Sequence, residues 1–278
     1  MERVVLSPAK VNLFLKVVSE RPDGYHELVS VVDIVSIYDV IRLKELPDGE
    51  IRVRDRAGLL PEGRDNTIWR AIMLLKDRFR KASGIEAVVE KRIPLGSGLG
   101  GGSSNAARVM KALVRLWGLG VELPELMDLG REVGADVPLF LYGRPCVIRG
   151  VGDRVSPIDL PRLSYVIVYP NMNVSTREVY NRLRIVLTKG ENEVTFCGKF
   201  STALDIAGIL ENDLEKVALS MCPEIQTIKD RLREAGALGS LMTGSGSAVF
   251  GIFGDERGAR NAAKKMGGMG SVFIANSI

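Results

Sequence analysis

The sequence is poor in the residues that most often bind metals or form disulfides: its 278 residues include one histidine and three cysteines. Because His26 is the only histidine, a histidine-based metal centre or a Ser-His-Asp triad is not expected. Cys146, Cys197 and Cys222 form no CxxC pair. This spacing argues against a zinc site or a disulfide framework and favours buried thiols in a reducing compartment.

Long hydrophobic runs and blocks of like charge are also missing. No apolar run approaches the roughly 20 residues that span a bilayer, and the segment Met1–Val5 lacks the layout of a signal peptide. The formal net charge is +4, but the basic residues form no stripe interleaved with aromatic residues. We therefore expect a cytoplasmic protein that binds no nucleic acid or membrane, and both a monomer and a homodimer stay open.

The most informative segment that is present is a glycine-rich loop, Gly96–Ser104, which contains five glycines. It follows a strand-like run, Ala87–Ile93, and precedes a helix whose apolar residues recur every three or four positions. Glycines let backbone N–H groups come close to a ligand. The start of a helix adds unpaired N–H donors and a partial positive charge. The loop therefore predicts a phosphate-binding site.

Three familiar phosphate-binding motifs do not fit this loop. Gly96–Gly101 matches G-x-G-x-x-G, but a dinucleotide-binding site needs this motif in the first strand–helix unit, followed by an acidic residue on a second strand. Here several strands precede the loop, Pro94 interrupts the strand before it, and Glu122 lies among helical residues. A P-loop needs a lysine where this chain has Ser103, and a protein-kinase glycine loop lies between two strands.

The remaining sequence alternates between strand and helix signals. In the first half we expect a half-buried strand over Lys10–Val17, with Lys10 and Asn12 on its polar face. We also expect a turn at Arg21–Gly24, one bent strand or two over Val29–Leu43, and a helix that Asn66 caps and Ser83-Gly84 closes. Two further helices are expected, over Glu125–Val133 and from Asp136 onward.

The second half of the sequence begins after a change in amino-acid composition. Glycines and prolines over Arg149–Leu163 suggest a linker. Beyond it we expect a strand at Tyr165–Tyr169, a helix at Pro223–Ala235, and two strands joined by the small-residue loop Thr243–Ser247, whereas Leu183–Ser201 has no clear pattern. This organisation predicts an α+β protein with two domains, residues 1–154 and 155–278.

Three segments together resemble the GHMP small-molecule kinases: Ser7–Leu13, Pro94–Ala107 and Met242–Ala248. The resemblance implies the two-domain GHMP kinase fold, with a ribosomal-protein-S5-like domain followed by a ferredoxin-like α/β sandwich and the active site between them. Three further motifs, Arg21–Leu28, Gly134–Phe140 and Asn212–Glu215, are similar to those of family members whose acceptor is a cytidine-diphosphate-linked sugar alcohol.

The resemblance also implies roles for individual residues in ATP- and Mg²⁺-dependent phosphoryl transfer. Lys10 would lie beside the transferring phosphate, and Asp136 would accept the proton of the acceptor hydroxyl. From the residues alone, Asp136 is expected to cap a helix. This structural role is compatible with accepting the proton. The residues expected to bind ATP are Pro94, Gly96, Ser97, Gly98, Leu99, Gly100, Gly101, Gly102, Ser103, Ser104, Asn66, Lys91, Ser245 and Gly246. Ser104 is also a possible ligand of the metal.

The acceptor would be bound by Asn12, Tyr25, His26 and Tyr180. The resemblance implies that Tyr25 and Tyr180 stack on the two faces of a cytosine ring, while His26 forms hydrogen bonds with the edge of the base. Three alternatives stay open: a homoserine or mevalonate kinase of the same family, a dinucleotide-dependent oxidoreductase, and a non-catalytic protein that binds a nucleotide or RNA. A substrate without a base would not need Tyr25 and His26.

Overall fold

The computed structural model describes residues 2–183 and 200–278, and the chain forms two compact units built from interleaved segments. Unit 1 comprises Met1–Ala9, Tyr38–Ile93 and Gly100–Gly143, and unit 2 comprises Lys10–Ile37, Pro94–Leu99 and Arg144–Ile278. The expected boundary at residue 154 concerns two consecutive domains and stays a prediction. Cys197 and most of Leu183–Ser201 lie outside the described residues.

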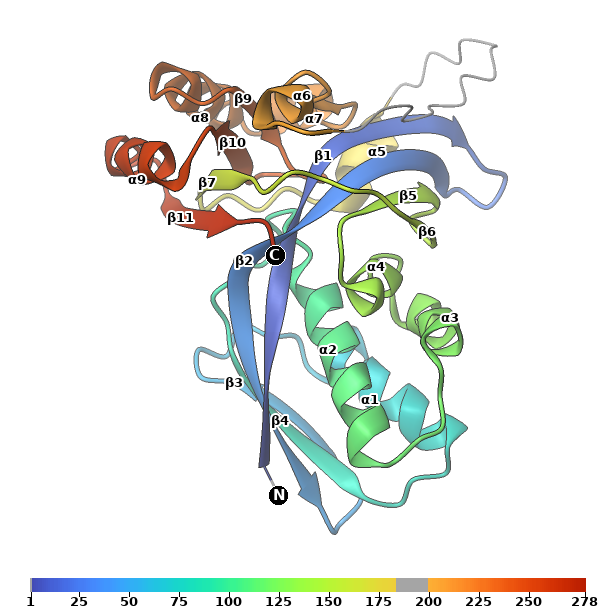
Figure 1. Cartoon of the computed structure of the whole chain (residues 1–278). Coiled ribbons are helices and arrows are strands. Elements are labelled where there is room, and N and C mark those ends of the chain that lie inside the picture. The colour runs from blue at the N-terminus through green and yellow to red at the C-terminus, as the bar shows by residue number, and fades with distance from the viewer. Residues whose placement is uncertain (1, 184–199) are drawn as a thin grey trace. The chain divides into compact units, whose positions relative to one another are not determined.

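Unit 1 is a sheet covered by helices on one face (Figure 1). Its strands are β3 (Ile51–Asp55), β4 (Gly84–Glu90) and the parts of β2 (His26–Leu46) and β1 (Glu2–Glu20) that belong to this unit, in that order. β3 runs parallel to β4, and β4 runs antiparallel to β2. The covering helices are α1 (Thr67–Arg78), α2 (Gly101–Leu116), α3 (Leu123–Val133) and α4 (Val137–Tyr142), and a short 3₁₀ turn, η1 (Gly63–Asp65), precedes α1.

Helix α1 begins where the sequence predicts and ends earlier. The Asn66 side chain accepts hydrogen bonds from the backbone N–H groups of Ile68 and Trp69, which confirms the predicted cap. The expected end at Ser83-Gly84 is wrong. The helix stops at Arg78 because Arg80 adopts a left-handed conformation (φ 50°) and the N–H of Lys81 bonds to the carbonyl of Lys76 at 3.0 Å. This is the hydrogen bond that closes a Schellman motif.

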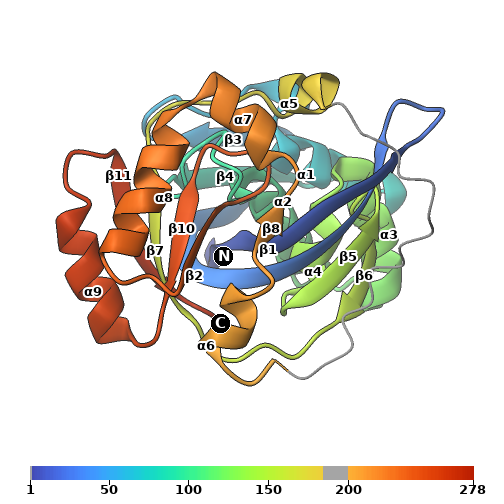
Figure 2. The same cartoon turned by 90° about the horizontal axis from the view of Figure 1, so that it is seen from above.

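Unit 2 contains a four-stranded antiparallel sheet in the order β11 (Ser271–Asn276), β7 (Ser164–Tyr169), β10 (Val249–Phe253), β9 (Gly239–Met242). Helices α8 (Glu224–Glu234) and α9 (Glu256–Lys265) pack on one face of this sheet (Figure 2). The unit also includes α5 (Thr176–Arg182), α6 (Ala203–Ala207), α7 (Glu215–Met221) and the short β8 (Glu211–Asn212), which pairs in parallel with β1. The mixed sheets and helices confirm the predicted α+β class.

Most of the segment expected to be a linker, residues 149–157, belongs to a β-hairpin in unit 2, and residues 158–163 connect this hairpin to β7. β5 (Cys146–Gly150) pairs with β2 and with β6 (Arg154–Pro157), both antiparallel. Gly150 and Gly152 have φ values of 71° and 101°, so these glycines form the turn of a hairpin. The linker prediction is therefore wrong, because turn glycines inside a hairpin give the same composition as a flexible connection.

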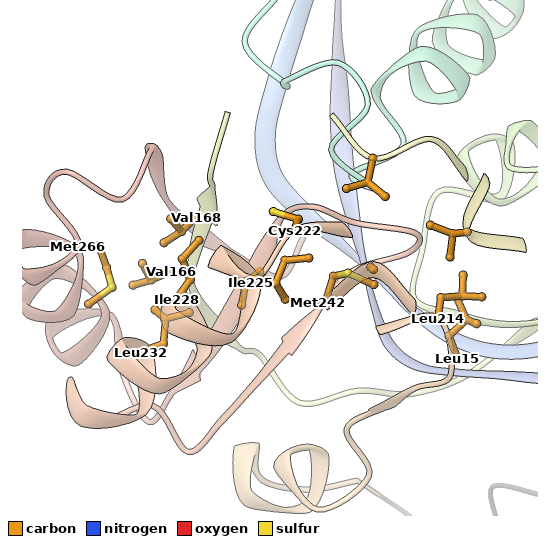
Figure 3. Packing of buried hydrophobic residues seen from close by; sticks show 14 of the residues in the cluster. Leu15, Val166, Val168, Leu214, Cys222, Ile225, Ile228, Leu232, Met242 and Met266 are labelled. Atoms are coloured by element: carbon orange, nitrogen blue, oxygen red, sulfur yellow. The ribbon is translucent and has the colours of Figure 1, made fainter. Parts of the chain in front are cut away.

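The hydrophobic core of unit 2 lies between the four-stranded sheet and helices α7, α8 and α9 (Figure 3). Val166 and Val168 of β7 face Ile225, Ile228 and Leu232 of α8, whose spacing of three and four residues forms one apolar stripe. Cys222 belongs to this cluster, and burial raises the pKa of its thiol to about 11. The Cys222 and Cys146 thiols are buried, as predicted.

Strand β1 includes the predicted strand Lys10–Val17, but that segment is not half-buried. Every residue from Ser7 to Leu15 is buried, so the face that carries Lys10 and Asn12 is enclosed as well as the apolar face. The expectation of one solvated face was wrong. Polar residues on this face make hydrogen bonds inside the protein, as described below.

None of the helices in the described part of the chain is long and apolar enough to cross a membrane.

A buried carboxyl group ties β2 to β7 and to the C-terminal end of the described chain in unit 2. Asp33 is fully buried, and its Oδ2 accepts hydrogen bonds from the hydroxyl groups of Tyr165 (2.7 Å) and Ser277 (2.6 Å). Its other oxygen, Oδ1, has no hydrogen-bond partner among the described residues. Burial disfavours the charged form and raises the pKa of Asp33 from 3.8 to about 6, although the two hydroxyl groups oppose this shift.

Replacing Asp33 by asparagine is expected to change how stability depends on pH. Because the pKa in the folded state is raised, the neutral carboxyl stabilises the fold below about pH 4, and this contribution is lost as pH rises through about 6. Relative to Asp33→Asn, the wild type should lose about 2–3 kcal/mol of unfolding free energy between pH 4 and pH 7. Urea unfolding of both proteins across this range measures the difference, and parallel curves would contradict the assignment.

Candidate active site

The first part of the glycine-rich loop, Pro94–Leu99, packs closely against other segments of unit 2. Gly98 has a φ of 79°, and a Cβ atom added to it would lie 2.1 Å from the carbonyl oxygen of Thr243. The N–H of Ala248 donates to the carbonyl of Ser97 at 3.1 Å. Ser97 also donates its hydroxyl hydrogen to the carbonyl of Pro94 at 2.7 Å. The loop is thus held backbone to backbone against the second small-residue loop, an arrangement that only glycine permits at position 98.

The second small-residue loop, Thr243–Ser247, connects β9 and β10. Hydrogen bonds from side chains of other segments hold it in place. The side-chain amide of Asn212 donates hydrogen bonds to the carbonyls of Met242 and Gly244, both at 2.8 Å. The hydroxyl groups of Ser245 and Thr176 lie 2.7 Å apart. A plain hairpin would need none of these contacts, so the structure presents this loop as a rigid element beside the glycine-rich loop.

Lys10 and Asn12 lie next to both loops of unit 2. The Lys10 ammonium donates to Oδ1 of Asn12, and it lies 3.2 Å from the position that a Cβ of Gly244 would occupy. The backbone N–H of Lys10 bonds to the carbonyl of Leu99 at 3.1 Å. Lys10 and Asn12 are both buried, with 4% and 3% of their surface exposed. The structure therefore brings together Lys10, Asn12 and both loops, as the sequence analysis expects.

Asn12 is oriented by two hydroxyl groups that the sequence analysis did not single out. Its backbone N–H donates to Oγ1 of Thr243 at 2.9 Å, and its side-chain amide donates to Oγ of Ser30 at 2.9 Å. The Thr243 hydroxyl in turn donates to Oδ1 of Asn12 at 3.3 Å. These bonds fix which way the Asn12 amide points, so its oxygen faces the Lys10 ammonium.

The second part of the glycine-rich loop belongs to unit 1, where it starts helix α2. Gly100 precedes the helix in a left-handed conformation (φ 73°). Ser104 is fully buried and accepts a hydrogen bond from the hydroxyl of Ser7 at 2.8 Å. Ser103 is half-buried, and its hydroxyl lies 3.9 Å from the position that a Cβ of Gly134 would occupy. Of the two serines, Ser103 is therefore the less buried.

Asp136 precedes helix α4 in unit 1, but its side chain does not cap that helix. Its backbone is helical (φ −83°, ψ −4°), whereas a capping residue is normally extended, and no side-chain cap hydrogen bond forms. The expectation that Asp136 caps the helix was wrong. Within its own unit, the described residues give this half-buried carboxylate no hydrogen-bond or ion-pair partner. The carboxylate is therefore available for another task.

Asn66 and Lys91, two of the residues expected to bind ATP, lie close to the start of α2. Asn66 is buried, and the next residue, Thr67, donates its hydroxyl hydrogen to the carbonyl of Gly102 at 2.8 Å. The Lys91 ammonium lies 3.0 Å from the position that a Cβ of Gly101 would occupy. It also forms a buried ion pair with Asp39 at 2.5 Å. Unit 1 thus places Lys91, and the residue that follows Asn66, at the helix start formed by Gly100–Ser104.

The predicted acceptor-binding aromatic residues form one ring contact in unit 2. The rings of His26 and Tyr180 lie 5.0 Å apart between centroids and are tilted by 37°. Tyr25 is 64% exposed and follows the tight turn Arg21–Gly24, which is closed by a 3.0 Å bond from the N–H of Gly24 to the carbonyl of Arg21. The turn is confirmed. Stacking of Tyr25 and Tyr180 on a base stays a prediction.

Sequence reasoning missed several residues that hold the site in place. They are Ser7, Ser30, Asp39, Asn173 and Asn212. Ser7 and Asn212 carried a signal, because each lies in one of the recognised motifs. The others bond to residues far away in the chain, and no local spacing indicates such partners.

Comparison with known proteins agrees with this geometry. The model of the GHMP kinases N terminal domain matches residues 66–144, and that of the GHMP kinases C terminal domain matches residues 199–271. The chain belongs to the GHMP kinase family. It is 42% identical over 277 residues to 4-diphosphocytidyl-2-C-methyl-D-erythritol kinase of Syntrophus aciditrophicus, covering 99% of both chains. It is 43% identical to the enzyme of that name from Geobacter sp., covering 94% of this chain and 93% of the relative.

Solved structures give the same fold. A crystal structure of 4-(cytidine 5'-diphospho)-2C-methyl-D-erythritol kinase aligns with a TM-score of 0.79 at 37% identity, covering 99% of this chain and 98% of the other. Homoserine kinase from Cytophaga hutchinsonii aligns with a TM-score of 0.73 at 20% identity, covering 100% and 94%. At that identity the second likeness supports the fold alone. The two-domain GHMP kinase fold predicted from the motifs is confirmed.

Proposed function

We propose that this protein uses ATP to phosphorylate the 2-hydroxyl of 4-(cytidine 5'-diphospho)-2-C-methyl-D-erythritol, a step of the non-mevalonate (methylerythritol phosphate) route to isoprenoids. The observation that carries this proposal is the 42% identity to an enzyme of that name over 99% of both chains. In the transfer, the acceptor oxygen attacks the γ-phosphorus of ATP, the bond to the β-phosphate oxygen breaks, and ADP leaves.

Lys10 is proposed to stabilise the charge of the transferring phosphoryl group. Its ammonium lies beside the two glycine-containing loops of unit 2 and is held by the neutral amide of Asn12. In phosphoryl transfer, most of the acceleration comes from positioning and electrostatic stabilisation, which suits a lysine fixed in this way.

Asp136 is proposed to accept the proton of the acceptor hydroxyl. Its carboxylate has no competing cap or ion pair in unit 1. Mg²⁺ bound with ATP would neutralise negative charge on the phosphates. Because Mg²⁺ prefers oxygen ligands and usually takes only one or two from the protein, the half-buried Ser103 hydroxyl fits this ion better than the enclosed Ser104.

The acceptor's cytosine is proposed to lie against the aromatic residues of unit 2. Tyr25 and Tyr180 would stack on its faces, and His26, already in ring contact with Tyr180, would form hydrogen bonds with its edge. Because both substrates are charged and water-soluble, we also propose that the enzyme works in the cytoplasm, as a monomer or homodimer, without a nucleic-acid or membrane partner.

An ADP-release assay with three acceptors tests the proposal. ATP and Mg²⁺ are supplied with the cytidine-diphosphate acceptor, homoserine or mevalonate in separate reactions. We expect turnover with the first acceptor only. Turnover with homoserine or mevalonate alone would replace the proposed acceptor, and ATP binding without turnover of any acceptor would favour a non-catalytic nucleotide-binding protein.

A further inference from the structure

Asp39 of β2 is a fully buried carboxylate that connects Lys91 to the segment leading into the glycine-rich loop, all within unit 1. Its Oδ1 accepts hydrogen bonds from the backbone N–H groups of Arg92 (2.8 Å) and Ile93 (2.9 Å). Its Oδ2 accepts a hydrogen bond from the Lys91 ammonium at 2.5 Å. Three consecutive residues of the chain are thus bound to one side chain that lies more than 50 positions earlier.

These bonds determine where the chain leaves the sheet. β4 ends at Glu90, although the sequence predicts a strand as far as Ile93. The N–H groups of Arg92 and Ile93 bond to Asp39 instead of to a neighbouring strand, and Pro94, the next residue, has no N–H to donate. Asp39 therefore fixes the direction in which the chain enters the loop Gly96–Ser104.

The ion pair also fixes the Lys91 ammonium near the start of α2. The side chains of Lys91 and Asp39 are 5% and 0% exposed. Neither charge would be tolerated there alone, because an unpaired buried charge is strongly unfavourable. An ammonium has three N–H donors, and Asp39 is the only partner that the described residues provide for Lys91. Two donors are left beside Gly101 for a ligand at this helix start.

We propose that Asp39 is a positioning residue for nucleotide binding, acting through Lys91 and through the entrance of the glycine-rich loop. It does not itself touch the nucleotide. The inference rests on the proposed function, because it takes ATP as the ligand of this loop. It goes beyond that function by assigning a role to a buried residue of β2 that no motif contains.

The test compares Asp39→Asn with the wild type. Asparagine keeps an oxygen for the N–H groups of Arg92 and Ile93 but removes the charge that holds Lys91. We expect the KM for ATP, and the Kd for ATP measured by calorimetry without acceptor, to rise about tenfold or more, since hydrogen bonds to charged groups have effects of this size. The KM for the acceptor should stay within about twofold. Glu86→Gln, which removes an exposed ion pair with Arg54 on neighbouring strands, is the matched control and should change neither value.

A double-mutant cycle separates positioning from mere stabilisation. In a Lys91→Met background, Asp39→Asn should have little further effect on ATP affinity, because its target is gone. A melting temperature that falls while the Kd for ATP is unchanged would overturn the proposal. If Asp39→Asn alone does not fold, the Kd for ATP of the Lys91→Met variant is the test. An unaltered Kd in that variant would also overturn the proposal. If the wild type binds ATP but phosphorylates no acceptor, the proposed function fails while the calorimetric test still stands.

Discussion

Replacing Asp136 by asparagine is expected to lower kcat by about 100-fold or more, the range found when a general base is removed, while the free energy of unfolding hardly changes. The expectation that the free energy of unfolding hardly changes comes from the structure. Because the Asp136 side chain forms no cap hydrogen bond at α4, its replacement by an amide of the same shape removes no contact within unit 1. Any loss of turnover then reflects chemistry rather than misfolding.

The measurement is steady-state kinetics at saturating ATP and acceptor, together with a melting curve of the same preparation. Asn66→Ala is a useful contrast, because Asn66 does cap a helix and its loss should cost about 1 kcal/mol of unfolding free energy. If Asp136→Asn kept near-normal kcat, the residue would be removed from the proton transfer. If Asp136→Asn melted well below the wild type, the Asp136 side chain would stabilise the fold, contrary to the absence of a cap hydrogen bond.

Replacing Gly98 by alanine is expected to destabilise the protein by about 2–5 kcal/mol, since it combines the cost of a left-handed backbone with that of a steric overlap. The new Cβ would lie 2.1 Å from the carbonyl oxygen of Thr243. One backbone would have to move away from the other, and the two loops that flank Lys10 would separate. ATP binding should therefore be lost even in the fraction that remains folded.

Gly268→Ala is the matched control for Gly98→Ala. Gly268 belongs to the same unit and has nearly the same backbone angle (φ 81°, against 79° for Gly98), but nothing lies within 4 Å of a Cβ added there. This variant should lose only the backbone part, about 1–2 kcal/mol, and bind ATP normally. Equal destabilisation in urea unfolding of the two variants would show that contact with Thr243 is unimportant.

The elements that the sequence predicted correctly are those determined by neighbouring residues. Asn66 starts α1, α8 (Glu224–Glu234) lies within the helix expected over Pro223–Ala235, and the Arg21–Gly24 turn closes as expected. Caps and turns of this kind depend on side chains within a few positions, so a short window of sequence contains the needed information. The motifs added the family and its fold.

The errors arose where a distant contact or a detail of backbone geometry decides the outcome. Asp39 ends β4 early by bonding to backbone N–H groups 53 and 54 positions away, and nothing near Glu90 indicates this. Asp136 has the residue type of a cap but not the extended backbone that capping requires. Residues 149–157 have the composition of a linker, and only the pairing of β5 with β6 shows that they belong to a hairpin.

The interleaving of the two units limits how this chain can be divided. Unit 2 takes its first segment, Lys10–Ile37, from near the amino end, so the stretch after residue 154 does not contain all of its own unit. A separately expressed fragment 155–278 would lack Asp33, the acceptor for Tyr165 and Ser277, and would lack the part of β1 that pairs with β8. A split at the apparent domain boundary would therefore yield two incomplete proteins, and reporter insertions or fragment-complementation designs are better placed in an exposed turn such as Pro47–Gly49.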